Sequence, residues 1–339
     1  MDRASSSAFK MDRELASGSF ERQRSQFRGW VGNDPRQVAG AASHGLRKFP
    51  VAAGRYHLYV SLACPWCHRT VIVRELAGLA DALPISYLAP FRDARGWAFT
   101  GERFDDGPGG EYVDNLHGWQ LISEAYRLSD PEFDFDERIT VPVLWDTQTE
   151  HIVSNESADI LRMLADPQSL GSLAKRPLDL YPERLRAEID TLNARVYDTV
   201  NNGVYRAGFA RRQESYEQAF GELFETLEML ERLLGERRYL LGAQLTEADW
   251  RLFPTLMRFD EVYNLHFRCN KRRLVDYPNL WRYARELYQH PGVAQTVAMA
   301  QIKRHYYTTH EELNPKQIIP VGPGFDWTEP HGRDRRAAA

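Results

Sequence analysis

Two cysteines three positions apart are the first candidates for reactive side chains in this sequence. They are Cys64 and Cys67, in the stretch YVSLACPWCHRTV at 59–71, directly behind an alternating apolar run. This spacing suits a disulfide, half of a zinc site, or a nucleophilic thiol with a neighbour. A cysteine attacks as its thiolate, so the surroundings of each sulfur decide between these chemistries.

The composition narrows these choices. The chain has 339 residues, of which 43% are hydrophobic and 27% are charged, which is enough for a sizeable core and two domains. Three cysteines, the third being Cys269, cannot form a disulfide framework. No second Cys or His pair at ligand spacing completes a zinc site, so we expect no metal.

The charge and hydropathy patterns exclude several kinds of partner. The 43 basic and 47 acidic side chains give a net charge of −4, without the overall basicity typical of nucleic-acid binding. The sequence has no apolar run of about 18 residues to span a bilayer. Residues 1–20 lack the apolar stretch of a secretory signal. We therefore expect a cytoplasmic protein that binds neither nucleic acid nor membrane.

The residues around the cysteine pair predict a strand followed by a helix. RYHLYVSL at 55–62 alternates as a strand does, and Pro65 suits the first position of a helix. A thiolate at Cys64 is favoured there by amide groups and the helix dipole, which lower its pKa below the usual value of about 8.5. Cys67 lies one turn further on and lacks this benefit. The alternative is two structural cysteines on an apolar helix face.

The pattern up to residue 166 alternates strands and helices. A strand is predicted at 85–91, a helix at 117–128, a hairpin at 139–153 and a helix at 157–164. This order is compatible with a thioredoxin-like sheet, in which a cis proline leaves a backbone edge open to a peptide-like ligand. Val141-Pro142 is the candidate, and an ordinary trans proline on an edge strand is the alternative.

Glu156 and Ser157 are placed at the start of the helix at 157–164. Backbone amides at a helix start can receive a carboxylate ligand, although a plain capping box produces a similar string. From residue 183 onward the apolar period becomes helical, which predicts an all-helical second half. Its helices are predicted at 184–205, 216–235, 245–259 with Thr246 as N-cap and Asp249 in the first turn, and 279–289.

The ordered set of motifs resembles a known family. Cys-Pro-Trp, Val-Pro and Glu-Ser, followed by a helical half with LTEAD, resemble the cysteine-type glutathione transferases. Among these, YVSLACPWCHRT, VNNGVYRAGFA, QLTEADWRLFPTLMRFDEVY, HFRCNKRR, IKRHYYTTHEELNP and EPHGRD resemble the glutathionyl-hydroquinone reductases (Xi class), from about residue 28 to the C-terminus. The resemblance implies an α/β thioredoxin-like domain followed by an all-α glutathione-transferase domain.

The resemblance and the patterns together predict the following organisation. The segments are an irregular arm at 1–54, a thioredoxin-like glutathione-binding domain at 55–166, a linker at 167–182, a helical substrate domain at 183–312 and a tail at 313–339. A homodimer is expected by analogy with this fold. Glutathione is implied as co-substrate, together with aromatic hydroquinone conjugates.

The resemblance also implies roles for individual residues. Cys64 is implied as the nucleophile. The implied glutathione-binding residues are Trp97, Arg127, Val141, Pro142, Glu156 and Ser157, with Arg127 at a glycine carboxylate; Tyr205, Tyr263 and Tyr306 are implied around the aromatic substrate. For each tyrosine the alternative is core packing with a satisfied hydroxyl.

The implied activity is reduction of glutathionyl-hydroquinones through a mixed disulfide between Cys64 and glutathione, with release of oxidised glutathione. Two alternatives use the same fold: a glutaredoxin-like thiol transferase or dehydroascorbate reductase, and a non-catalytic ligand-binding protein. One position departs from the family, because this chain has Cys67 where relatives often have alanine. This departure leaves open whether the mechanism uses one thiol or two.

Overall fold

The structure is a computed structural model that describes residues 14–15, 18–34, 48–93, 95–133 and 139–333. The chain forms two compact units, which are described separately below. The first unit contains Arg24–Asp179 and Gln295–Ala298. The second contains Leu180–Ala294 and Met299–Ala339, and it also includes the N-terminal segment Phe9–Gln23.

A four-stranded mixed sheet forms the centre of the first unit. Its strands are β1 (Tyr56–Val60), β2 (Ile85–Tyr87), β7 (Val143–Asp146) and β8 (His151–Ser154), in the order β2-β1-β7-β8. Strand β1 runs parallel to β2 and antiparallel to β7, and β8 is antiparallel to β7. All five residues of β1 are buried, because the strand is central and covered on both faces.

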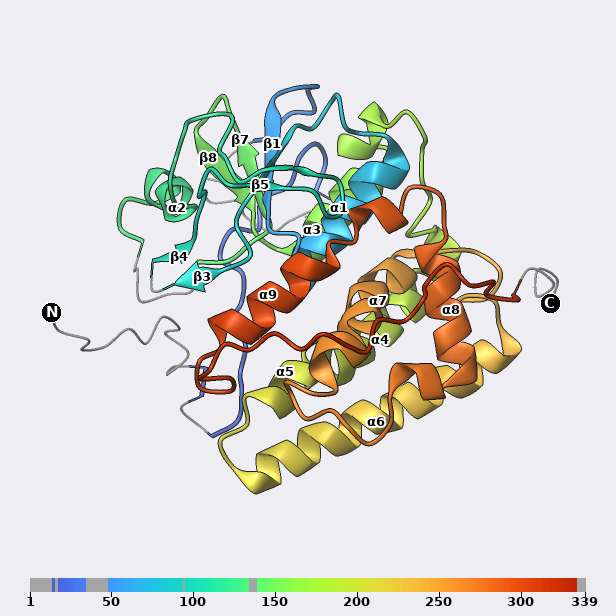
Figure 1. Ribbon diagram of the computed structural model, residues 1–339. Helices are drawn as coiled ribbons and strands as arrows, with labels where there is room; N and C mark the ends of the chain where they lie inside the picture. The colour runs from blue at the N-terminus through green and yellow to red at the C-terminus, as the bar shows by residue number, and fades with distance from the viewer. Residues whose placement is uncertain (1–13, 16–17, 35–47, 94, 134–138, 334–339) are drawn as a thin grey trace, which may run out of the picture. The chain divides into compact units, whose positions relative to one another are not determined.

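Three helices accompany this sheet. They are α1 (Pro65–Ala77), α2 (Ser123–Ser129) and α3 (Ser157–Ala165), and α1 packs against α3 (Figure 1). Helix α1 ends at Gly78, whose φ of 66° is in the left-handed region that glycine adopts without strain. The predicted order of strand, helix, strand, helix, hairpin and helix is confirmed, and so is the thioredoxin-like architecture.

The region between β2 and α2 differs from the prediction. Strand β2 ends at Tyr87 rather than at residue 91. The region then contains four two-residue strands that were not predicted: β3 (Arg92–Asp93) pairs with β4 (Gly96–Trp97), and β5 (Arg103–Phe104) pairs with β6 (Gly110–Glu111).

The helix predicted at 117–128 is also shorter in the structure, because its first part is a turn. The buried Asp114 carboxylate accepts the backbone N–H groups of His117 at 2.9 Å and Trp119 at 3.0 Å. A side chain that accepts hydrogen bonds from backbone amides competes with helix formation, because it offers those amides another partner. The helix α2 therefore begins only at Ser123.

The second unit is helical throughout its regular structure, as predicted. Its helices are α4 (Arg186–Val196), α5 (Gly203–Gly208), α6 (Gln213–Glu236), α7 (Glu247–Arg258), α8 (Pro278–Tyr288) and α9 (Met299–Thr309). Helix α6 packs against α5 and α8 (Figure 1). It continues past Gly235, which was predicted to end it, and α9 was not predicted as a separate helix.

The capping box at the start of α7 is confirmed, and it reaches beyond its own helix. The carboxylate of the buried Asp249 accepts the Thr246 backbone N–H at 2.8 Å. It also accepts the Leu240 N–H at 3.0 Å and the Tyr283 hydroxyl at 2.7 Å. Burial raises the pKa of Asp249, and these donors oppose that rise. The residue therefore ties α7 to α8 and to the segment before α7.

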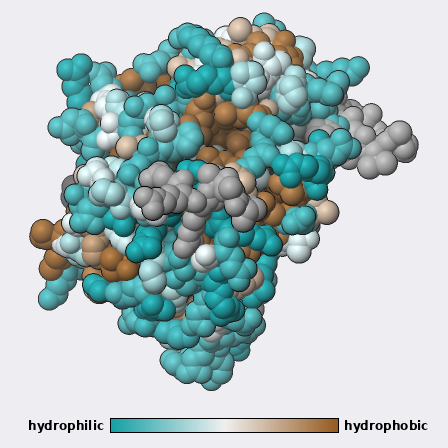
Figure 2. All heavy atoms as spheres, turned by 90° about the vertical axis from the view of Figure 1, so that its right-hand side faces the viewer, coloured by the Kyte–Doolittle hydropathy of each residue, from teal (hydrophilic) through white to brown (hydrophobic). Residues whose placement is uncertain are grey.

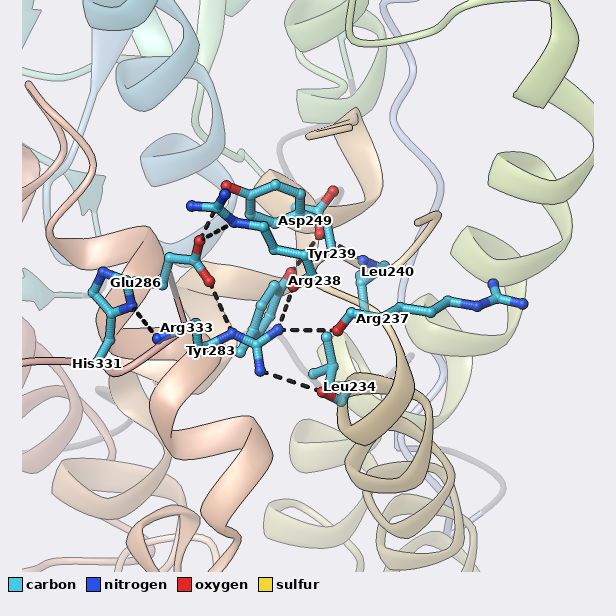
Figure 3. Close-up of polar contacts among 10 residues, drawn as sticks. All are labelled: Leu234, Arg237, Arg238, Tyr239, Leu240, Asp249, Tyr283, Glu286, His331 and Arg333. Atoms are coloured by element: carbon cyan, nitrogen blue, oxygen red, sulfur yellow. Dashed lines mark hydrogen bonds and ion pairs between the residues drawn. The ribbon is translucent and has the colours of Figure 1, made fainter. Parts of the chain in front are cut away.

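A buried arginine, Arg333, helps to anchor the C-terminal tail (Figure 3). Arg333 is 1% exposed, and its Nε donates to Glu286 on α8 at 2.8 Å. Its other nitrogens donate to the backbone carbonyls of Leu234, Arg237 and Arg238 at the end of α6. Carbonyls at the end of a helix have no partner within the helix, so the guanidinium satisfies them.

The surface carries many charged groups. Hydrophilic side chains predominate on the face drawn in Figure 2, and apolar side chains gather there in separate patches. Large apolar side chains that are exposed include Leu265, Ile318 and Val321. Within the described residues, no helix is both long and apolar enough to cross a bilayer.

We predict that Arg333→Met lowers the free energy of unfolding by about 3 kcal/mol, because it leaves the buried Glu286 and several helix-end carbonyls with fewer donors. Chemical denaturation followed by circular dichroism measures this difference. Arg282→Met is the matched control, since Arg282 is an exposed residue of α8 and its replacement is expected to cost less than about 0.5 kcal/mol. Equal stability of the two variants would contradict an anchoring role for Arg333.

Candidate functional site

Cys64 occupies the start of the first helix. It is the N-cap of α1, with φ −76° and ψ 124°, and Pro65 is the first helical residue. The Cys64 N–H donates to Ser61 O at 3.0 Å, and the Cys64 carbonyl accepts the His68 N–H at 3.0 Å. The turn between β1 and α1 therefore presents the thiol at the end of the helix where backbone amides and the dipole favour negative charge.

The Cys64 sulfur lies beside the predicted proline. Its Sγ is 3.7 Å from Val141 O, and the Val141–Pro142 peptide bond is cis, as predicted. Cys64 is 6% exposed, whereas Cys67 is completely buried. The structure contains no disulfide at either residue. The two thiols therefore differ both in their place on the helix and in their burial.

Glu156 and Ser157 lie at the start of α3, as predicted, but the cap is an acid rather than Ser or Asn. Glu156 is the N-cap, and its Oε1 accepts the Ala158 N–H at 3.1 Å. Ser157 is the first helical residue and is buried. The amides at this helix start favour negative charge, and one of them is already bonded to the Glu156 carboxylate.

Two residues that support this turn were not predicted. Ser25, in the N-terminal arm, donates its hydroxyl to Glu156 Oε2 at 2.9 Å. Arg69, on α1, is 2% exposed and donates to Ser157 Oγ at 3.4 Å. Both contacts join parts of the chain that are far apart in sequence, so no local motif signals them. They hold the side chains at the start of α3 in place.

The other candidates in the first unit are more dispersed. Trp97 belongs to β4 and is buried, with the Arg92 guanidinium 5.3 Å from its ring centre. Arg127 is an exposed residue in the last turn of α2. Its neighbour Tyr126 is buried instead and donates to the Thr140 carbonyl at 2.8 Å. The glutathione-binding roles of Trp97 and Arg127 stay predictions.

The three predicted tyrosines form a hydrogen-bonded group in the second unit. The Tyr306 hydroxyl lies 2.5 Å from that of Tyr205 and 2.9 Å from that of Tyr263. They come from α5, from the π-helical turn Phe259–Tyr263 and from α9, and all three are buried. Burial raises the pKa of Tyr263 and of Tyr306 well above the usual value for a phenol. Both hydroxyls therefore stay protonated and can donate at physiological pH.

An aromatic cluster surrounds this group and was not predicted. Phe267 stacks on Tyr263 with ring centres 5.6 Å apart and meets Tyr205 edge-on at 5.3 Å. Phe209 packs against Phe267 at 5.0 Å. The three tyrosines are thus buried among aromatic rings, where a hydrogen bond to a charged oxygen is stronger than in water.

Two family models match the chain. The model described as glutathione S-transferase, N-terminal domain, matches residues 63–166, and the one described as glutathione S-transferase, C-terminal domain, matches 213–286. The chain is 46% identical over 325 residues to glutathionyl-hydroquinone reductase YqjG of Escherichia coli K12, covering 96% of this chain and 95% of YqjG. The chain belongs to the glutathionyl-hydroquinone reductase family.

Further relatives agree with this assignment. Glutathionyl-hydroquinone reductase PcpF of Sphingobium chlorophenolicum is 45% identical over 314 residues, which is 92% of each chain. The glutathione-bound structure of YqjG has a TM-score of 0.83 at 47% identity, covering 91% of this chain and 96% of that one. A Xi class GST from Natrialba magadii also has a TM-score of 0.83, at 44% identity, covering 91% of this chain and 88% of that one.

In the first unit the described residues place a thiol at the start of α1, a cis proline beside it and a second helix start at Ser157. Among the residues that the structure describes, no group of three or more His, Cys, Asp or Glu is arranged to hold a metal ion.

We predict that Cys64, and not Cys67, forms a mixed disulfide with glutathione. Incubation with oxidised glutathione should add one glutathionyl group to wild type and to Cys67→Ser, and none to Cys64→Ser, because only Cys64 lies at the helix start. Mass spectrometry of the intact protein and of its peptides measures this. A glutathionyl group on Cys67, or a Cys64–Cys67 disulfide as the main product, would contradict the prediction.

Proposed function

We propose that this protein reduces glutathionyl-hydroquinones to hydroquinones, with Cys64 as the nucleophile and glutathione as the co-substrate. The observation that carries the proposal is the Cys64 thiol at the N-cap of α1, 3.7 Å from Val141 O. This thiol belongs to a chain that resembles glutathionyl-hydroquinone reductases over nearly its whole length. The amides and dipole of the first turn favour its thiolate.

The bond that must break is the one between a ring carbon and sulfur, and an aryl carbanion is a poor leaving group. When a hydroxyl proton moves to the ring carbon that bears sulfur, the hydroquinone reaches its keto form. The Cys64 thiolate then attacks the glutathione sulfur, and the electrons of the carbon–sulfur bond form an enolate. The enolate takes up a proton and leaves as hydroquinone.

A second glutathione completes the cycle. Its thiolate attacks the disulfide between Cys64 and the first glutathione, which releases oxidised glutathione and restores the Cys64 thiolate. In total, one conjugate and one glutathione give one hydroquinone and one oxidised glutathione. The complete cycle as written needs no metal and no further reductant.

The glutathione itself is assigned to residues of the first unit. The Val141 backbone, next to the cis Pro142, binds the peptide of glutathione, and Glu156 with Ser157 binds its γ-glutamyl end. Trp97 covers the bound tripeptide, and Arg127 binds its glycine carboxylate. The start of α3 supports this assignment, since first-turn amides attract a carboxylate.

The tyrosine group is assigned to the ring oxygens of the substrate. The Tyr306 hydroxyl is hydrogen-bonded to those of Tyr205 and Tyr263, and each phenol carries a proton that it can donate. Donors aimed at an oxygen on which negative charge develops lower the barrier to the reaction. The hydroxyls therefore stabilise the enolate as it leaves.

A thiol transferase or dehydroascorbate reductase is the second candidate, because Cys67 gives the chain a Cys-x-x-Cys like that of glutaredoxins. Purified protein should be assayed with a glutathionyl-hydroquinone, hydroxyethyl disulfide and dehydroascorbate side by side, with Cys64→Ser as the inactive control. Turnover of the conjugate well above that of the other substrates supports the proposal. No turnover of any of them would indicate a ligand-binding protein.

We predict that Tyr→Phe changes at positions 205, 263 and 306 lower reduction of the conjugate by about a hundredfold, because each removes a donor to the departing oxygen. Reduction of hydroxyethyl disulfide should change little, since a thiolate leaves without such help. Steady-state kcat/KM for both substrates measures the contrast.

Tyr307→Phe is the control for these changes. Tyr307 is also buried, but its hydroxyl donates to the Glu261 carbonyl at 3.0 Å rather than to the tyrosine group. We expect this variant to keep wild-type selectivity between the two substrates. A parallel fall in both activities in the three other variants would show that the tyrosines only pack the core.

We also propose that the protein is a cytoplasmic homodimer. The dimer is inferred by analogy with glutathione transferase folds, which commonly pair. The location rests on the low number of cysteines, which is typical of proteins from a reducing compartment. Sedimentation equilibrium of the full chain tests the oligomeric state.

A further inference from the structure

A short segment of the N-terminal arm packs on the tyrosine group of the second unit. Phe20 is 2% exposed, and its ring stacks on Tyr205 with centres 6.3 Å apart and lies 5.6 Å from Phe209. The Ser19 hydroxyl donates to Ser215 Oγ at 2.9 Å, and the Arg211 N–H donates to Gly18 O at 3.3 Å. This segment, Gly18–Gln23, is therefore held on the helices by both apolar and polar contacts.

Arg22 brings a positive charge to the face of one of these tyrosines. Its guanidinium carbon is 4.8 Å from the centre of the Tyr205 ring and 5.2 Å from that of Phe20. Its Nε donates to Asn202 Oδ1 at 2.8 Å. The Asn202 carbonyl in turn accepts the Tyr205 N–H at 3.0 Å, so one residue holds both the arginine and the start of the turn that carries the tyrosine.

A cation fixed over a phenol ring acts on the phenol oxygen. When Tyr205 donates its hydrogen to an oxygen that is gaining negative charge, part of that charge is transferred to the phenol. A guanidinium on the ring face is attracted to the electron-rich ring and is attracted more strongly as the ring becomes negative. This gain exists mainly in the transition state, so it raises the rate rather than the affinity for the substrate.

We propose that Arg22 is a positioning residue that makes the Tyr205 hydroxyl a stronger hydrogen-bond donor to the hydroquinone oxygen, an inference that rests on the proposed function. Arg22 acts through Tyr205 and need not touch the substrate itself. The arm thereby supplies a residue that the reaction uses, in addition to packing against the helical unit.

The test compares Arg22→Gln with wild type, using a glutathionyl-hydroquinone and hydroxyethyl disulfide as substrates. We expect kcat/KM for the conjugate to fall roughly three- to thirtyfold, mostly through kcat, and reduction of the disulfide to stay within twofold. Arg22→Lys should recover much of the loss, because it keeps a cation near the ring. Arg24→Gln, at an exposed position two residues further along the arm, should behave as wild type.

The double variant Arg22→Gln with Tyr205→Phe separates this role from simple packing. If Arg22 acts through the Tyr205 hydroxyl, Arg22→Gln should cost less than about twofold once that hydroxyl is absent, because coupled residues are not additive. The same loss with and without the hydroxyl, or an equal loss for both substrates, would overturn the inference. Arg22→Met, which keeps the apolar stem, repeats the test if the glutamine variant is unstable.

Failure of this inference is distinct from failure of the proposed function. Wild-type protein that does not reduce the conjugate refutes the proposed function, whatever the variants do. Wild-type protein that reduces the conjugate, together with an Arg22→Gln variant of equal kcat/KM, refutes only the role of Arg22.

Discussion

The chemistry proposed for this protein depends on stabilising a thiolate that is almost completely covered by protein. Cys64 is 6% exposed, and burial by itself favours the neutral thiol. The first turn of α1 opposes this with its amides and dipole. The sulfur reaches that turn because β1 is fixed on both sides, by β2 and by β7. The Cys64 N–H then closes the turn onto Ser61, and Pro65 begins the helix.

The tyrosine group uses burial in the opposite way. A nucleophile must be charged in a covered place, whereas a donor must stay neutral there. Burial is the largest of the causes that raise the pKa of Tyr263 and Tyr306, so it helps to keep them in the form that the proposed reaction needs. The hydroxyls lie within hydrogen-bonding distance because of how three elements are placed, namely α5, α9 and the π-helical turn after α7.

Features that a local pattern determines could be predicted from the sequence. The start of α1 at Cys64-Pro65 and the capping box of Thr246 and Asp249 follow from residues that touch within one turn. The support that Arg69 gives to Ser157 could not be predicted, since 88 residues separate them. The contact between Arg333 and Glu286 could not be predicted either, because 47 residues separate the two. Such contacts depend on how helices pack, which periodicity does not specify.

Burial also argues for a cycle that uses one thiol and a second glutathione rather than Cys67. A resolving cysteine must attack as its thiolate. Cys67 is completely buried one turn inside α1. Burial therefore disfavours its thiolate, and the sulfur lacks the stabilisation available at the helix start. A glutathione thiolate from solution carries no such cost, which makes it the better nucleophile for the proposed disulfide at Cys64. The Cys-x-x-Cys spacing therefore resembles that of a dithiol enzyme, while the surroundings of its second sulfur favour a monothiol cycle.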